Sequence, residues 1–248
     1  PRLPALAVTG GKGGVGKTCV AVNLSIQLAG LGLRPLLVDC DLGLANADVL
    51  LGVNPTTTLF DVVFDQTPIG AAVINHPSGI GFIPAASGRE ELTALNPRQF
   101  RGILDELARV ARGYDLLVLD TAAGIQREVT HLLRAATASL VVLTPDPTSL
   151  TDAYALIKVL EQQEAGRDLR ILVNQVRDQQ EALQVFAKIR KVAQTYLHRD
   201  LSFAGYMPRD RAVQDAVRKR RPFAKDADSP AAQALLAAAT RLRGIDWK

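Results

Sequence analysis

The chain has 248 residues, 48% of them hydrophobic and 22% charged, which suits a single α/β domain with a sizeable core and excludes a disordered chain. Its two cysteines cannot form a disulfide framework, so we expect a reducing cytoplasmic environment, and no apolar run is long enough to cross a membrane. The net charge of +4 is too small to indicate a nucleic-acid partner by itself.

Short apolar runs alternate with longer amphipathic stretches. The predicted strands, rich in Val, Ile and Leu, are Ala5–Thr9, Pro35–Asp39, Gly81–Pro84, Asp115–Asp120, Leu140–Thr144, Leu169–Asn174 and Ser202–Tyr206. The predicted helices are Lys17–Ala29, Pro97–Ala111, Gln126–Ala135, Ser149–Ala165, Gln180–His198, Ala212–Lys219 and Pro230–Arg243. This alternation predicts one α/β domain over residues 1–248, with a mostly parallel sheet flanked by helices. The loops after parallel strands then meet at one edge, where ligands bind.

A glycine-rich loop follows the first predicted strand and opens the first helix. It fits the pattern G-x-x-x-x-G-K-[ST], in which backbone N–H groups and a helix N-terminus hold phosphates. We therefore expect Lys17 to reach the β- and γ-phosphates and the Thr18 hydroxyl to bind Mg²⁺. The predicted nucleotide-binding segment is Gly11, Lys12, Gly13, Gly14, Val15, Gly16, Lys17, Thr18 and Cys19.

Lys12 is a second lysine, which a minimal phosphate loop does not need. The run Lys12–Thr18 resembles the deviant Walker A motif of the MinD/ParA family of dimerising ATPases, which are P-loop NTPases of the SIMIBI type. The resemblance implies ATP or ADP with Mg²⁺ as cofactors and an ATP-dependent homodimer. In that dimer Lys12 would cross to the partner's nucleotide and act as a catalytic lysine. Physically, a cation beside a transferring phosphoryl group stabilises the charge of the transition state.

Two carboxylates, Asp39 and Asp41, stand at the end of the second predicted strand. From the residues alone, either one could simply cap the following turn. The segment resembles the family's Asp-x-Asp-x-Gly switch, which implies that Asp41 positions the attacking water and that Asp39 lies near the Mg²⁺ shell. The resemblance also implies that Asn46 reaches the nucleotide region across the dimer.

Asp120 ends an apolar strand, as in a Walker B motif, and is predicted to hold Mg²⁺ through water. The turn after it resembles the family's second switch, which implies that the Gly124 N–H contacts the γ-phosphate, although Ala122 stands where the family commonly has proline. By resemblance, Asn174, Pro208 and Asp210 border the adenine. Because these residue types also favour turns, turn chemistry remains the alternative for all of them.

The run Thr144–Lys158 closely resembles a segment typical of the FlhG/FleN branch, with Asp146 where that branch usually has glutamate. The resemblance implies an ATPase, slow without a stimulating partner, that regulates flagellar number or placement. The implied partners are an FlhF-like GTPase and a FleQ-like enhancer-binding transcription activator. The branch's N-terminal activator segment and C-terminal membrane helix are expected to be absent. We expect a cytoplasmic protein with at most transient contact at the inner membrane or cell pole, for which Trp247 is a hint.

The segment Arg209–Lys225 is basic, and it is either a solvated helix face or a contact for phosphates or an acidic partner. The second interpretation motivates an alternative function as a ParA/MinD-like ATPase for partition or division positioning, although direct DNA binding is not expected. A nucleotide-binding regulator without turnover is a further alternative. Cys19 and Cys40 are expected to be small packing residues rather than ligands or nucleophiles.

Overall fold

The computed structural model describes residues 3–41, 46–85 and 96–247. The strands are β1 (Leu3–Thr9), β2 (Pro35–Cys40), β3 (Ile74–Asn75), β4 (Gly81–Ile83), β5 (Leu116–Thr121), β6 (Ala136–Leu143), β7 (Asp168–Val176) and β8 (Ser202–Pro208). The α-helices are α1 (Lys17–Gly30), α2 (Ala47–Leu51), α3 (Leu59–Phe64), α4 (Pro97–Val110), α5 (Arg127–Ala135), α6 (Pro147–Gln163), α7 (Gln179–Leu197), α8 (Arg211–Arg218) and α9 (Pro230–Arg243). Two short 3-10 helices, η1 (Ile69–Ala72) and η3 (Ala111–Gly113), complete the elements of these ranges.

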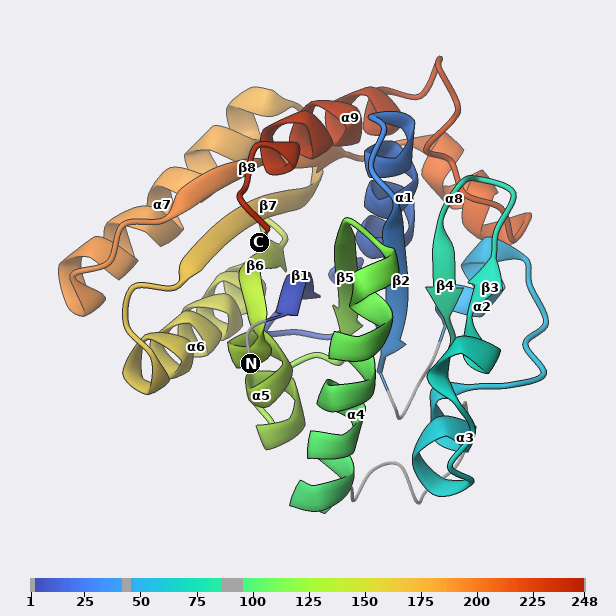
Figure 1. Cartoon of the computed structure of the whole chain (residues 1–248). Coiled ribbons are helices and arrows are strands. Elements are labelled where there is room, and N and C mark those ends of the chain that lie inside the picture. The colour runs from blue at the N-terminus through green and yellow to red at the C-terminus, as the bar shows by residue number, and fades with distance from the viewer. Residues whose placement is uncertain (1–2, 42–45, 86–95, 248) are drawn as a thin grey trace.

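Within the described residues, eight strands form one sheet in the order β3-β4-β2-β5-β1-β6-β7-β8 (Figure 1). Every neighbouring pair is parallel except β3 and β4, which are antiparallel. The predicted mostly parallel α/β fold is therefore confirmed. Since β1 lies at the centre between β5 and β6, the loop that follows β1 leaves the middle of the sheet beside the ends of these two strands, and β2 lies next to β5.

Helices cover both faces of the sheet, and alternate strand residues point to opposite layers. On β1, Leu6 and Val8 belong to the apolar cluster that contains α1, α2, α8 and α9, whereas Ala5 and Ala7 belong to the cluster that contains α3 to α7. The strands are buried on both faces, which explains their nearly continuous apolar sequence. Helices thus pack against both faces of the sheet, and loops lie at the edge where the parallel strands end.

Some sequence expectations were wrong in detail. The strand predicted from Leu140 begins at Ala136, directly after α5, because Arg167 bonds the carbonyl groups at this corner and the Thr137 hydroxyl donates to the Leu3 carbonyl at 2.7 Å. Trp247 is only 8% exposed and packs in the core, so it offers no surface anchor. In the part of the chain that the structure describes, no helix is both long and apolar enough to span a bilayer.

Candidate functional site

The phosphate loop is held closely by the surrounding backbone on one side and is open on the other. A Cβ on Gly10 would lie 2.7 Å from the Val142 carbonyl oxygen, and a Cβ on Gly11 would overlap the Asp152 carbonyl of α6. A Cβ on Gly13 or Gly14 would meet nothing within 4 Å. The inner glycines therefore allow the loop to lie against β6 and α6, while the outer glycines face the space where a phosphate can approach.

Lys17 is buried at the start of α1, with 8% of its surface exposed. Its ammonium lies 3.5 Å from the Lys12 carbonyl oxygen, so it points back into the loop. Burial lowers the pKa of Lys17, and the charges of Asp120 and Asp41 oppose that shift. A phosphate placed in the loop would supply the anionic partner that a buried ammonium needs.

Asp120 is the last residue but one of β5 and is fully buried, and neither of its carboxylate oxygens has a hydrogen-bond partner among the described residues. Burial and the neighbouring charge of Asp39 raise its pKa well above the usual value, while Thr18 and Lys17 oppose that shift. A buried, unpartnered carboxylate beside a threonine side chain at a phosphate loop suits a hydrated Mg²⁺. Thr18 and Asp120 therefore fit the metal role expected of them, which remains a prediction.

Asp39 is the register partner of Asp120 on the neighbouring strand and is 1% exposed. Its carboxylate accepts the backbone N–H groups of Asp41, Asn46 and Ala47 at 3.0, 3.3 and 3.2 Å. Burial raises its pKa to about 7 even though these hydrogen bonds oppose the shift. Asp39 thus links the start of α2 to β2, which is the capping role that the sequence allowed as an alternative. A role in the Mg²⁺ shell stays a prediction.

Asp41 and Asn46 border residues 42–45, which lie outside the described part of the chain. Asp41 is half-buried, and its charge acts on Lys17. Asn46 is exposed and stands at the N-cap position of α2. These positions are compatible with the switch roles that the resemblance implies, and the roles themselves stay predictions.

Lys12 is exposed on the outer side of the loop, and its ammonium donates a 2.8 Å hydrogen bond to the Thr148 hydroxyl. Thr148 lies in the first turn of α6, within the Thr144–Lys158 run, but sequence reasoning did not include it in the site. The two residues are 136 positions apart, so only the fold brings them together. Among the described residues, the Lys12 ammonium thus lies outside the core and has its hydrogen bond to Thr148.

The Gly124 N–H donates a 3.0 Å hydrogen bond to the Gly10 carbonyl oxygen. Gly124 has φ of 98°, a conformation that favours glycine, and a Cβ there would lie 2.8 Å from the Gln126 side-chain oxygen. The second switch therefore contacts Gly10, the residue directly before the phosphate-loop motif. Contact of this N–H with a γ-phosphate, as predicted, would require the bond to Gly10 to open.

Asn174 braces the phosphate loop from the end of β7. Its side-chain amide donates to the Val15 carbonyl oxygen at 2.7 Å, and its side-chain oxygen accepts the Gln175 N–H at 2.7 Å. The side chain also fills the space next to Gly16, where φ is 92°. Sequence reasoning missed this bracing contact, which spans 159 positions. The predicted contact of Asn174 with adenine stays a prediction.

Pro208 is the last residue of β8 and pairs with Val176 of β7, and Asp210 stands two residues after it. Asp210 caps α8 by accepting the Ala212 N–H at 2.8 Å, and its other oxygen accepts the Ser229 hydroxyl at 2.6 Å. Burial raises the pKa of Asp210, but these hydrogen bonds and one from the Ala231 N–H outweigh it, so the pKa lies below its usual value. Asp210 thus joins the start of α8 to the start of α9. This is the kind of local structural role that the sequence offered as the alternative to adenine binding, and the adenine role stays a prediction.

Neither cysteine is activated. Burial raises the pKa of Cys19 to about 12 and that of Cys40 well above its usual value, with nearby carboxylates acting in the same direction. Both thiols therefore stay protonated at neutral pH, which suits packing residues rather than nucleophiles. No cluster of metal-ligating side chains occurs among the residues that the structure describes.

Residues 6–223 match the family model described as the CobQ/CobB/MinD/ParA nucleotide binding domain. The chain belongs to the MinD/ParA family. Two curated relatives of this family are the antiactivator FleN of Pseudomonas aeruginosa, 45% identical over 88% of this chain and 78% of FleN, and the flagellum site-determining protein YlxH of Helicobacter pylori, 30% identical over 89% of this chain and 74% of YlxH. The expected resemblance to the FlhG/FleN branch is thereby confirmed.

Among solved structures, the septum site-determining protein MinD of Pyrococcus horikoshii, in complex with Mg-ADP, is similar with a TM-score of 0.79. The two proteins are 26% identical, and the match covers 97% of this chain and 96% of that MinD. As a member of the MinD/ParA family, the chain is a nucleotide-binding ATPase, in agreement with the geometry of its phosphate loop.

Proposed function

We propose that this chain is an ATP-dependent dimerising switch that regulates flagellar number or placement. Its similarity to the antiactivator FleN, at 45% identity, carries the proposal, and the similarity to YlxH and the Thr144–Lys158 run support it. A slow ATPase of this kind controls a partner by the lifetime of its ATP-bound dimer rather than by the product that it releases. An enhancer-binding transcription activator of the FleQ type and a GTPase of the FlhF type are the proposed partners.

In this proposal, different residues of the chain have different roles in hydrolysis. Lys17 and the loop N–H groups hold the phosphates, and Thr18 with Asp120 would hold Mg²⁺, which supplies charge neutralisation when bound. Asp41 orients the attacking water. Lys12 is exposed, so it can leave Thr148 and reach the nucleotide of the second chain, where its charge stabilises the transition state.

The deciding experiment measures the solution mass of the chain with ADP and with ATP plus Mg²⁺, beside an Asp41→Ala variant. We expect a monomer with ADP, a dimer with ATP, and an Asp41→Ala protein that remains dimeric because it no longer hydrolyses ATP. An unchanged mass in both nucleotides would overturn the dimeric switch and leave a monomeric regulator. Single-turnover hydrolysis far above background would reject a regulator without turnover.

The alternative, a partition ATPase that binds DNA, has support in the basic segment after β8. Arg218, Lys219, Arg220 and Arg221 are all exposed at the end of α8. Such an ATPase would bind random duplex DNA strongly at low salt, lose that binding as salt rises, and lose it on Arg218→Glu. If the ATP-bound chain does not bind duplex at low salt, this alternative is removed.

A further inference from the structure

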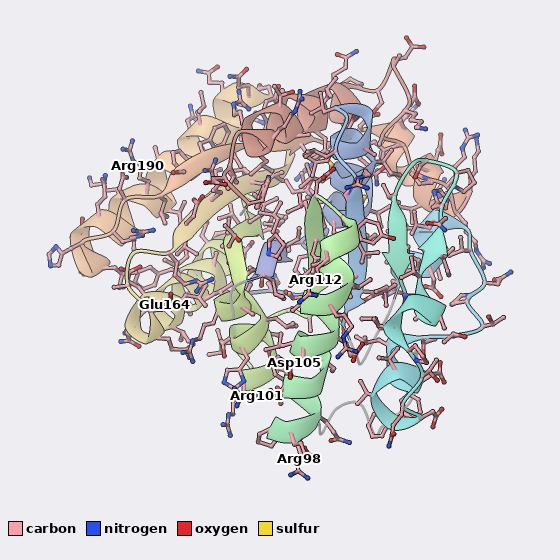
Figure 2. The ribbon with its side chains drawn as sticks, viewed as in Figure 1. Arg98, Arg101, Asp105, Arg112, Glu164 and Arg190 are labelled. Atoms are coloured by element: carbon pink, nitrogen blue, oxygen red, sulfur yellow. The ribbon has the colours of Figure 1, made fainter. Side chains whose placement is uncertain are left out.

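Helix α4 carries a stripe of arginines that the nucleotide site does not use. The stripe consists of four arginines and one aspartate, all exposed and at spacings of three and four residues: Arg98, Arg101, Asp105, Arg109 and Arg112. Figure 2 labels Arg98, Arg101, Asp105 and Arg112 along this helix. This spacing places them on one face of the helix and its 3-10 continuation. The opposite face packs into the core through Phe100, Ile103 and Leu107.

A groove of about 610 Å³ lies between this stripe and α5. Its apolar wall contains Phe100, Leu104 and Ala135, and the Phe100 ring lies 5.5 Å from the His131 ring. Arg101 lines it from α4 and Arg134 from α5, and both are exposed. The groove thus combines an apolar floor with a guanidinium contributed by each of the two helices.

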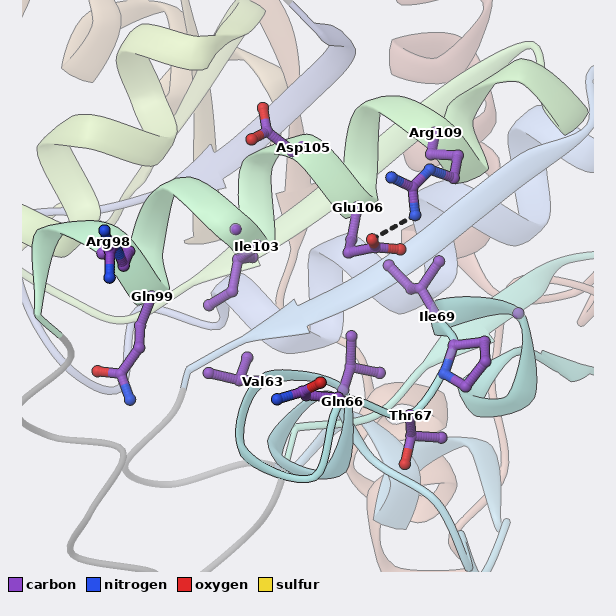
Figure 3. Close-up of a pocket in the computed structure, with 14 residues that line it drawn as sticks. Val63, Gln66, Thr67, Ile69, Arg98, Gln99, Ile103, Asp105, Glu106 and Arg109 are labelled. Carbon is purple, nitrogen blue, oxygen red and sulfur yellow. Dashed lines mark hydrogen bonds and ion pairs between the residues drawn. The ribbon is translucent and has the colours of Figure 1, made fainter.

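The two arginines of this groove, Arg101 and Arg134, form no ion pair with a described residue, although the carboxylates of Asp105 and Glu164 also line it. Arg109, by contrast, is paired with Glu106 at 2.5 Å. Figure 3 shows that the Arg109–Glu106 pair lies in a different groove, of about 710 Å³, on the other side of α4 toward α3. Of the two arginines that line that second groove, Arg98 and Arg109, Arg109 is paired within the chain, whereas neither arginine of the groove toward α5 forms an ion pair with a described residue.

We propose that the α4/α5 groove binds an acidic, amphipathic segment of a partner protein. Carboxylates of the segment would form paired hydrogen bonds with Arg101 and Arg134, for which the planar guanidinium is suited, while an apolar side chain covers Phe100 and Leu104. Desolvation in the groove would make these charge pairs stronger than ordinary surface pairs.

The floor of the groove favours a protein segment over a nucleic acid. Apolar side chains have no role in neutralising phosphates, but they accommodate the apolar face of a helix. Asp105 and Glu164 also line the groove, and Glu164 is paired with Arg167 at 2.6 Å, so the carboxylates of the segment would lie at Arg101 and Arg134 rather than along the whole groove. The surface is formed by α4 and α5 rather than by the phosphate loop, so this proposal goes beyond the proposed function and can fail without affecting it.

The test selects binders from a phage-displayed library of random peptides long enough for about four helical turns. We expect the enriched peptides to combine Asp and Glu with Leu or Phe. A selected peptide should bind the chain less tightly as salt is raised, and the Arg101→Glu/Arg134→Glu variant should bind it at least about tenfold more weakly.

The matched control is Lys188→Glu/Lys191→Glu, which changes the net charge equally on exposed positions of α7. Its peptide affinity should stay as in the unaltered chain, and all three proteins should bind ATP and melt alike. Enrichment without acidic residues, or equal loss of affinity in both double variants, would overturn the proposal. Binding of random duplex DNA that is lost only with Arg101→Glu/Arg134→Glu would overturn it in favour of a nucleic-acid surface.

Discussion

The ammonium of Lys12 and the hydroxyl of Thr148 are joined by a 2.8 Å hydrogen bond within one chain. The proposed catalytic role of Lys12 lies in the partner's site, so the two contacts exclude each other. An exposed contact of this kind contributes roughly 1 kcal/mol or less, and exchange for a phosphate contact would be favourable. Lys12 is therefore held by a weak contact, which it would exchange for the partner's phosphate in the proposed dimer.

We predict that Lys12→Ala binds ATP but neither dimerises nor hydrolyses it normally. Lys17 and the loop N–H groups remain to hold the phosphates, while the cation that would bridge the two chains is lost. Nucleotide titration and solution mass with ATP and Mg²⁺ check the two halves of this expectation, with Lys188→Ala as the surface control. An ATP-dependent Lys12→Ala dimer like that of the unaltered chain would contradict the role of Lys12 across the dimer.

Gly11→Ala and Gly13→Ala should differ sharply in stability. A methyl group at Gly11 overlaps the Asp152 carbonyl, which belongs to a helix backbone and cannot rotate away, whereas Gly13 has open space. We expect Gly11→Ala to lower the free energy of unfolding by about 1–3 kcal/mol and Gly13→Ala to change it by less than about 0.5 kcal/mol. Denaturant unfolding of the nucleotide-free proteins measures both. Equal effects would show that α6 does not restrict the loop.

Asn174→Ala separates two roles for this side chain. If Asn174 chiefly braces the loop through Val15, its loss should weaken ATP and GTP binding alike, by about fivefold for one lost hydrogen bond. A contact with the base would instead reduce the preference for ATP over GTP. Because the amide is already bonded to Val15 and Gln175, we expect the parallel loss. A change confined to ATP would favour the adenine role.

The stability of the nucleotide-free protein should fall as pH rises from about 4 to about 7. Burial raises the pKa of Asp39 from 3.8 to about 7 and that of its neighbour Asp120 well above its usual value, so in this window the folded chain keeps protons that the unfolded chain has released. The stabilisation is complete below the unfolded pKa and is lost as pH passes the folded pKa. Urea unfolding across this range should show a smaller slope for Asp39→Asn. Parallel slopes would remove Asp39 as the cause.

Most of the sheet follows from sequence because its strands are continuous apolar runs. The elements that were not predicted, α2, α3 and β3, have five, six and two residues, too few to show a period. The start of β6 at Ala136 was also missed, since alanine favours helix and the strand is fixed there by pairing with β1. In these elements, tertiary contacts rather than the local preferences of the residues decide the structure.

The candidate site was likewise predicted only in part. The phosphate loop and the carboxylates at the strand ends are visible in sequence, since their chemistry depends on local order and on strand position. The contacts Lys12–Thr148 and Asn174–Val15 join distant segments that are brought together by the packing of α6 against the phosphate loop and by the strand order β1-β6-β7. Their residue types are ordinary in turns and helix starts, so the sequence pattern alone carries no signal for them.

The guanidinium of Arg167 is 5% exposed and donates to the carbonyl groups of Leu133, Arg134 and Ala136, where α5 meets β6 without a loop. These hydrogen bonds hold the end of α5 and the start of β6 together. We therefore expect a rearrangement of the second switch to be confined to the turn between the end of β5 at Thr121 and the start of α5 at Arg127. In that case α5 keeps its position against β6 while the turn before it moves.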